Sequence, residues 1–179
     1  MGVAHDDRAV PAARHGERRV RRAGERERRQ RAVGHSDVTG RRVPSKGDNT
    51  PALGPAGTVH ASLADWAKFI RLHLDGAEGS LTLSPAALTR LHTQHPTTAM
   101  YPARYGWGWG MWDDVGGLGL GHDGSNGLWY CQCQVVTGRD IAFLAVANIG
   151  GGEGVGDNGN GDTACWKLIE HLRDRYLSS

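Results

Sequence analysis

The stretch Gly119-Leu-Gly-His-Asp-Gly-Ser-Asn-Gly127 runs directly into Leu128-Trp-Tyr-Cys-Gln-Cys-Gln-Val-Val136. Its four glycines in nine residues allow tight turns and a close approach of the backbone to a bound group, because glycine has no Cβ. His122 stands at the edge of this approach, and imidazole can give or take a proton near neutral pH. The stretch therefore predicts one wall of an active-site cleft, followed by a strand.

The segments around this stretch predict a mixed fold. Ser62 and Ser84-Pro85 are helix-start signals, and Gly76 is a stop for the first of these helices. Further elements are expected as strands over 105–112, 128–136 and 139–148, with a hairpin turn at Thr137-Gly138 and a last helix over 162–177. The apolar run 141–147 indicates cover on both faces of the sheet. The order predicts an α+β fold, with helices packed on an antiparallel sheet.

Three finer expectations follow from composition and residue spacing. The Pro- and Gly-rich stretch 43–57 is expected to be an irregular connector. Large and small residues alternate over 105–112, so its aromatic side chains are expected on one face of one strand. The first and the last helix should each bury one stripe: Leu63, Trp66, Phe69, Ile70, His73 and Leu74 in the first; Trp166, Ile169, Leu172 and Tyr176 in the last.

Charge divides the chain into two parts. Residues 1–42 hold 12 arginines and six acidic residues, whereas residues 43–179 carry a net charge of −4, giving the total of +2. Residues 1–34 have no sustained apolar face, so they are expected to be disordered, or to be out-of-frame sequence; a nucleic-acid-binding arm is the third interpretation. Residues 35–179 are then the folded domain, and its acidic balance gives no reason to expect nucleic acid as a partner.

Several site classes can be set aside. Gly119-x-Gly-x-x-Gly124 is followed by a strand rather than a helix, which argues against a dinucleotide site. Asp157–Asp162 lacks the ligand pattern of a calcium loop, and Cys131 and Cys133 share a strand face without further zinc ligands nearby. We therefore expect no metal and no cofactor. No run is long enough for a membrane span, and the N-terminus has no secretory signal, so the chain as it stands is expected to be cytoplasmic.

Residues from about 35 to 179 resemble the C-terminal part of the β-lactamase-related serine hydrolases, which include class C β-lactamases, D-Ala-D-Ala carboxypeptidases and family VIII-type esterases. The resemblance rests on three segments: Gly54–Phe69, Tyr105–Trp109 and Gly121-His-Asp-Gly-Ser-Asn126. The last is similar to the third active-site box, Lys-Thr-Gly or His-x-Gly. The resemblance implies a partial β-lactamase/transpeptidase-like fold. It also implies that His122 helps bind and polarise the substrate, that Gly124 permits its approach, and that the Ser125 N–H is half of an oxyanion hole.

The sequence lacks the catalytic motifs of this family. The family's nucleophile lies in Ser-x-x-Lys, but the residues three before Lys46, Lys68 and Lys167 are not serine. A Tyr-x-Asn box is also absent, so the catalytic set is incomplete. We therefore expect a C-terminal fragment of a hydrolase of small amide or ester substrates, inactive without the missing N-terminal half of the domain. The alternative is a non-catalytic protein that binds a peptide or a cell-wall fragment.

Overall fold

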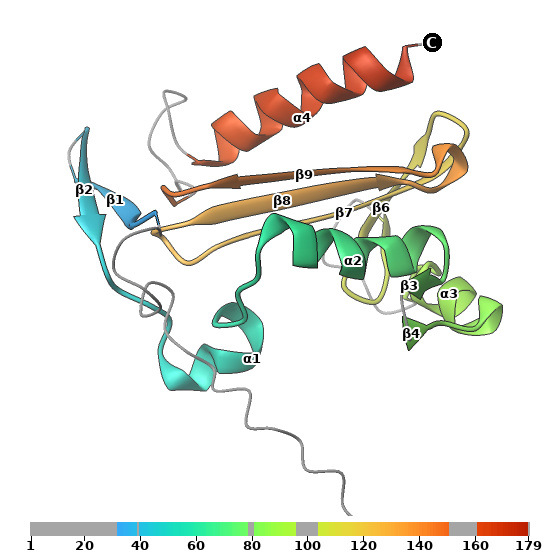
Figure 1. The fold of residues 1–179 in the computed structure, drawn as a ribbon, viewed down its shortest axis with the longest axis horizontal. Helices are drawn as coiled ribbons and strands as arrows, with labels where there is room; N and C mark the ends of the chain where they lie inside the picture. The colour runs from blue at the N-terminus through green and yellow to red at the C-terminus, as the bar shows by residue number, and fades with distance from the viewer. Residues whose placement is uncertain (1–31, 39, 79–80, 96–103, 151–160, 179) are drawn as a thin grey trace, which may run out of the picture.

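The structure is a computed structural model that describes residues 32–38, 40–78, 81–95, 104–150 and 161–178. Residues 1–31 of the predicted N-terminal segment 1–34 lie outside the described residues. Residues 157–160, the first part of the segment that was compared with a calcium loop, also lie outside them. The described elements form three layers, with a central sheet between helix α2 on one face and helix α4 on the other (Figure 1).

The central sheet has five strands in the order in which they occur in the chain: β5 (Arg104–Tyr105), β6 (Gly110–Asp114), β7 (Gly117–Ser125), β8 (Tyr130–Val136) and β9 (Ile141–Ala147). All neighbouring strands are antiparallel. The predicted α+β fold is therefore confirmed. The hairpin predicted at Thr137-Gly138 is also present, as a 3-10 turn over Thr137–Arg139 that ends at Asp140, whose φ is 51°.

Each face of the sheet carries its own core. Leu120 and Val135 pack with Ile70 of α2 (Leu63–Leu74) on one face. On the other face, Val136 and Phe143 pack with Ile169 and Cys165 of α4 (Gly161–Leu177). Because side chains alternate along a strand, every second residue of β7, β8 and β9 belongs to the same face. The expectation of cover on both faces of 141–147 is confirmed.

The helix starts are those that the sequence predicts. The hydroxyl of Ser62 accepts a hydrogen bond from the Asp65 N–H at 3.1 Å, and the hydroxyl of Ser84 accepts one from the Ala87 N–H at 3.1 Å, at the start of α3 (Pro85–Leu91). Such caps satisfy N–H groups that have no partner within the helix. Gly76 follows α2 with φ 73°, a conformation that favours glycine.

The expected single strand over 105–112 is wrong. The chain turns back between β5 and β6, where the Gly106 N–H donates to the Trp109 carbonyl at 2.7 Å and Gly108 has φ 85°. Trp107 is 46% exposed on this turn, whereas Trp109 is buried, so the aromatic residues do not share one face. A Gly-x-Gly alternation fits a strand and a tight turn equally well, because glycine permits both.

The connector expected over 43–57 is more ordered than predicted. Its first residues belong to the hairpin of β1 (Gly34–Val38) and β2 (Arg41–Ser45), and it continues as η1 (Pro51–Leu53) and α1 (Gly54–Gly57). The short strands β3 (Ala77–Glu78) and β4 (Leu81–Thr82) follow α2 and pair with each other. Short elements of this kind carry no periodic signal that a sequence pattern could reveal.

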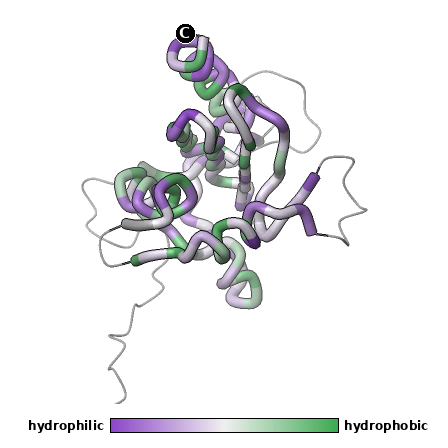
Figure 2. The backbone as a smooth tube through the Cα atoms, turned by 90° about the vertical axis from the view of Figure 1, so that its right-hand side faces the viewer, coloured by the Kyte–Doolittle hydropathy of each residue, from purple (hydrophilic) through white to green (hydrophobic). Residues whose placement is uncertain are grey.

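The predicted helix stripes are right only in part. In α4, Ile169 is fully buried and Leu172 is partly buried, but Trp166 and Tyr176 are 46% and 55% exposed. Cys165, one position before Trp166, occupies the buried place instead, and hydrophilic and hydrophobic residues are mixed along this helix (Figure 2). In α2, Trp66 packs against the core as expected, whereas Phe69 is 51% exposed.

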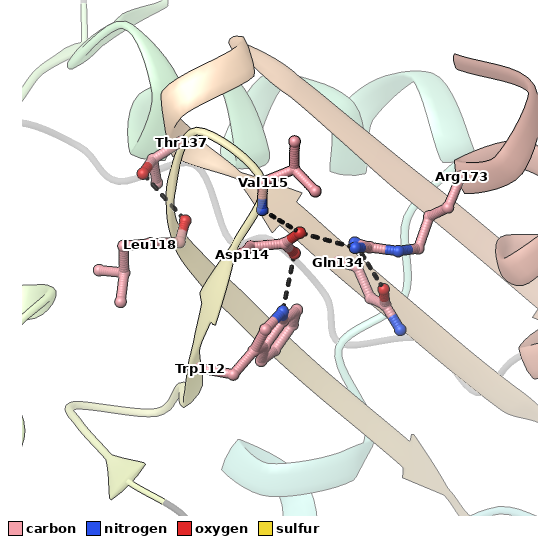
Figure 3. Close-up of polar contacts among 7 residues, drawn as sticks. All are labelled: Trp112, Asp114, Val115, Leu118, Gln134, Thr137 and Arg173. Atoms are coloured by element: carbon pink, nitrogen blue, oxygen red, sulfur yellow. Dashed lines mark hydrogen bonds and ion pairs between the residues drawn. The ribbon is translucent and has the colours of Figure 1, made fainter. Parts of the chain in front are cut away.

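A partly buried ion pair joins the end of β6 to α4 (Figure 3). The Arg173 guanidinium donates to Asp114 Oδ1 at 2.7 Å and to Gln134 Oε1 at 3.2 Å. Asp114 also accepts from the Trp112 indole N–H and from the Val115 N–H, both at 2.7 Å. Burial alone would raise the pKa of Asp114, but these hydrogen bonds outweigh it and hold the pKa below its usual value.

Candidate active-site wall

The predicted cleft wall is itself a strand, β7, which was not expected as one. β7 pairs with β8 from Gly119 to Ser125, but β6 pairs with it only from Gly117 to Gly121. Beyond Gly121, no strand in the described part of the chain pairs with the outer edge of β7 at 122–124. This segment, which we call the open edge, can offer its backbone to an extended ligand as an added strand.

His122 and Gly124 lie on the α2 face of the sheet. His122 is directly opposite Cys133, which belongs to the core under α2, and Gly124 lies two residues farther on the same face. His122 is exposed, and a Cβ built on Gly124 would meet nothing within 4 Å. An exposed imidazole thus lies beside an unobstructed stretch of backbone.

The other glycines of the stretch have different roles. On the α4 face, the Trp112 ring lies against Gly119 and Gly121, where an added Cβ would come within 2.3 Å and 2.9 Å of ring atoms. These two glycines accommodate the tryptophan, not a ligand. Gly127 has φ 79° in the turn between β7 and β8. Of the four glycines, only Gly124 is left to provide open space beside His122.

This difference can be measured by substituting each glycine with alanine. Gly119→Ala forces its Cβ into the Trp112 ring, so we expect it to lower the free energy of unfolding by about 1–3 kcal/mol. Gly124→Ala is the matched control, because its Cβ enters open space on the same strand. Urea denaturation of both variants checks this. An equal decrease in the free energy of unfolding of the two variants would contradict the packing of Trp112 on Gly119.

Ser125 and Asn126 use their side chains to close the β7–β8 turn. Asn126 Oδ1 accepts from the Leu128 N–H at 3.1 Å and from the Trp129 N–H at 3.0 Å, and Ser125 Oγ accepts from the Gly127 N–H at 3.0 Å. Their occurrence in the stretch is therefore explained by turn formation. Any part that Ser125 takes in a site would be played by its backbone, at the end of the open edge.

Asp123 points to the opposite face and fixes β7 to β8. Its Oδ2 accepts a hydrogen bond of 3.0 Å from the hydroxyl of Tyr130, and burial together with this bond raises the pKa of Tyr130. The phenol therefore remains a donor at neutral pH. Because side chains alternate, Asp123 holds the strand on the α4 face of the sheet, whereas its neighbours His122 and Gly124 lie on the α2 face.

The floor beside the open edge was not predicted. Gly124 lies opposite Cys131, and Cys131 lies opposite Val146, so the three form a row across β7, β8 and β9 on the α2 face. All three are exposed. Cys131 and Cys133 share this face, as the sequence predicts, but only Cys133 is buried. Burial raises the pKa of Cys131, which does not favour a thiolate nucleophile.

The described residues provide no metal-binding cluster at this wall. In the described ranges, no three His, Cys, Asp or Glu side chains converge to hold a metal ion. No helix of that same part of the chain is long and apolar enough to cross a membrane. The wall is thus an exposed imidazole, an open strand edge and a small apolar floor.

Comparison with solved structures places this arrangement in a known fold. The octameric penicillin-binding protein homologue from Pyrococcus abyssi is similar with a TM-score of 0.56 and 20% identity, over 81% of this chain and 32% of that one. The sequence matches the Beta-lactamase family over residues 8–164, and the chain belongs to this family. The match begins inside the arginine-rich segment.

A relative of known sequence agrees with this membership. Penicillin-binding protein 4 of Amycolatopsis lactamdurans is 32% identical over 106 residues, which make up 55% of this chain and 28% of that protein. The chain therefore spans about a third or less of the length of the relatives it matches. The partial β-lactamase-like fold implied by the resemblance is confirmed.

Proposed function

We propose that this chain is the substrate-binding wall of a β-lactamase-related serine hydrolase that transfers an acyl group from a small amide or ester to water. The observation that carries the proposal is the open edge of β7, with exposed His122 and unobstructed Gly124 on one face. An extended substrate would pair with this edge, His122 would orient and polarise it, and the Ser125 N–H would stabilise the oxyanion.

The nucleophile and its base must come from elsewhere. The sequence contains neither Ser-x-x-Lys nor Tyr-x-Asn, and a binding wall without a nucleophile forms no acyl-enzyme. We therefore expect the isolated chain to show no turnover of β-lactams or p-nitrophenyl esters. Turnover that a serine-directed phosphonate abolishes would overturn this part of the proposal.

A chimera tests the wall itself. Residues 35–179 of this chain can replace the corresponding part of penicillin-binding protein 4, so that the relative supplies the rest of the protein. We expect His122→Ala and Gly124→Val to lower kcat/KM for an acyl substrate by about 100-fold, the usual scale for losing a transition-state contact. Asp113→Ala, on the exposed end of β6, is the control. Equal activity in all variants of a chimera that hydrolyses the substrate would contradict the roles of His122 and Gly124.

A non-catalytic binding function is the second candidate, and the same open edge favours it, since strand addition needs no nucleophile. A peptide or cell-wall fragment that binds would raise the melting temperature of the isolated chain by mass action. The shift should vanish in Gly124→Val, whose branched side chain would obstruct the edge. If no fragment in a panel of peptides and cell-wall fragments changes the melting temperature, this function is excluded.

A further inference from the structure

Two histidines join helix α3 to helix α2. His73 lies in the last turn of α2 and is only 5% exposed, and His92 is the residue at which α3 ends. Nδ1 of His73 lies 3.1 Å from Nε2 of His92, and the two rings are stacked with their centroids 5.4 Å apart. A hydrogen bond between two imidazole nitrogens needs a lone pair on one of them, so the contact requires that at least one ring is neutral.

The surroundings of this histidine pair do not favour a positive charge. The rings of Phe69 and Trp109 pack against His73, with centroids 5.1 Å and 4.8 Å away. In the described part of the chain, neither imidazole has a hydrogen bond or an ion pair with a carboxylate. Burial therefore lowers the pKa of His73 to about 4, with a smaller contribution from His92, whose own pKa is also lowered by burial. The charged side chains near the pair on the two helices have partners of their own: Asp75 for Arg71, and the Trp107 ring for Arg90.

Helix α3 contributes no buried side chain to the fold. None of its seven residues is buried, and none belongs to the core under α2 or to the core under α4. Both cores are therefore complete without α3. Beyond the helix, the His95 N–H donates to the Tyr105 carbonyl at 2.9 Å, which joins the segment after α3 to β5. An element with few buried apolar contacts opens at a lower free energy than the whole domain, so α3 can separate while the sheet stays folded.

We propose that α3 is released by acid: as the pH falls, His73 and His92 each take up a proton, and α3 separates from α2 while the sheet and its two cores stay folded. Two protonated imidazoles cannot remain in contact, because neither has a lone pair to accept a hydrogen bond and their like charges repel. Once separated, both rings reach water and bind protons near pH 6.5, as exposed histidines do. This opening is distinct from unfolding of the whole chain, and it is independent of the substrate-binding wall at the open edge of β7.

Hydrogen exchange of the α3 amides counts the protons that the opening takes up. The exchange rate of each amide, relative to its rate in an unstructured peptide at the same pH, gives the equilibrium constant for opening. Below pH 6.5, each proton that only the open form binds raises this constant by up to about tenfold per pH unit. In the unmodified chain, we therefore expect the constant for α3 to rise by more than tenfold per pH unit, approaching about 100-fold, while the amides of β8 and β9 stay protected.

His92→Gln distinguishes the histidine pair from His73 alone. The glutamine side chain can still form a hydrogen bond with His73 but takes up no proton, so the opening constant should rise by at most about tenfold per pH unit. His171→Gln, which removes an exposed histidine of α4, is the matched control and should keep the pH dependence of the unmodified chain. A rise of tenfold or less per pH unit in the unmodified chain, a loss of protection in β8 and β9 at the same pH, or an unchanged dependence in His92→Gln would each overturn the proposal.

Discussion

Asp114→Ala is expected to lower the free energy of unfolding by about 3 kcal/mol, the lower end of the range for buried pairs, because it leaves the partly buried Arg173 cation without its anion. The Asp114 side chain is only 2% exposed and that of Arg173 is 23% exposed, and their nitrogen and oxygen atoms are 2.7 Å apart. The substitution also removes the acceptor of the Trp112 indole N–H and of the Val115 N–H. The part-buried indole N–H would lose its partner and add to the loss, whereas the exposed Val115 N–H can donate to water.

The neighbouring residue provides the control. Asp113 forms an ion pair of 2.6 Å with Arg104, but its side chain is 92% exposed and that of Arg104 is 43% exposed. Solvent screens such pairs, so Asp113→Ala should lower the free energy of unfolding by at most about 1 kcal/mol. Urea denaturation of the two variants measures the difference. If both cost the same, the Asp114–Arg173 pair does not fix α4 to the sheet.

This pair illustrates what the sequence could not reveal. Asp114 and Arg173 are 59 positions apart, and nothing in their local patterns relates them. By contrast, the Ser62 and Ser84 caps were predictable because donor and acceptor are three residues apart. The β8–β9 hairpin was predictable for the same reason. Contacts between residues a few positions apart can be predicted from the sequence, whereas packing between distant elements cannot.

The candidate wall likewise has one feature that the sequence could predict and one that it could not. The common face of His122 and Gly124 follows from strand alternation and needs no structure beyond the strand itself. The open edge depends on where β6 stops pairing with β7, which the turn at Gly106–Trp109 determines by starting β6 at Gly110, opposite Gly121. A glycine-rich sequence gives no indication of that register, so β7 was mistaken for a turning segment.

His73 makes the stability of the fold depend on pH. It belongs to α2 and is only 5% exposed, with its Nδ1 3.1 Å from Nε2 of His92 at the end of α3 and its ring against Phe69 and Trp109. Burial, and to a smaller extent the neighbouring His92, lowers the pKa of His73 to about 4; burial also lowers the pKa of His92. Both imidazoles are therefore neutral in the fold at pH 7.

The sign of the effect follows from proton uptake. An unfolded histidine has a pKa of about 6.5, so between pH 6.5 and pH 4 the unfolded chain binds protons that folded His73 does not. The free energy of unfolding should therefore be greatest above pH 6.5 and fall by up to about 3 kcal/mol on acidification to pH 4. His73→Leu, which keeps an apolar side chain at this site, should flatten that slope. Urea midpoints from pH 4 to 7.5 measure it, and an unchanged slope in His73→Leu would show that other groups are responsible.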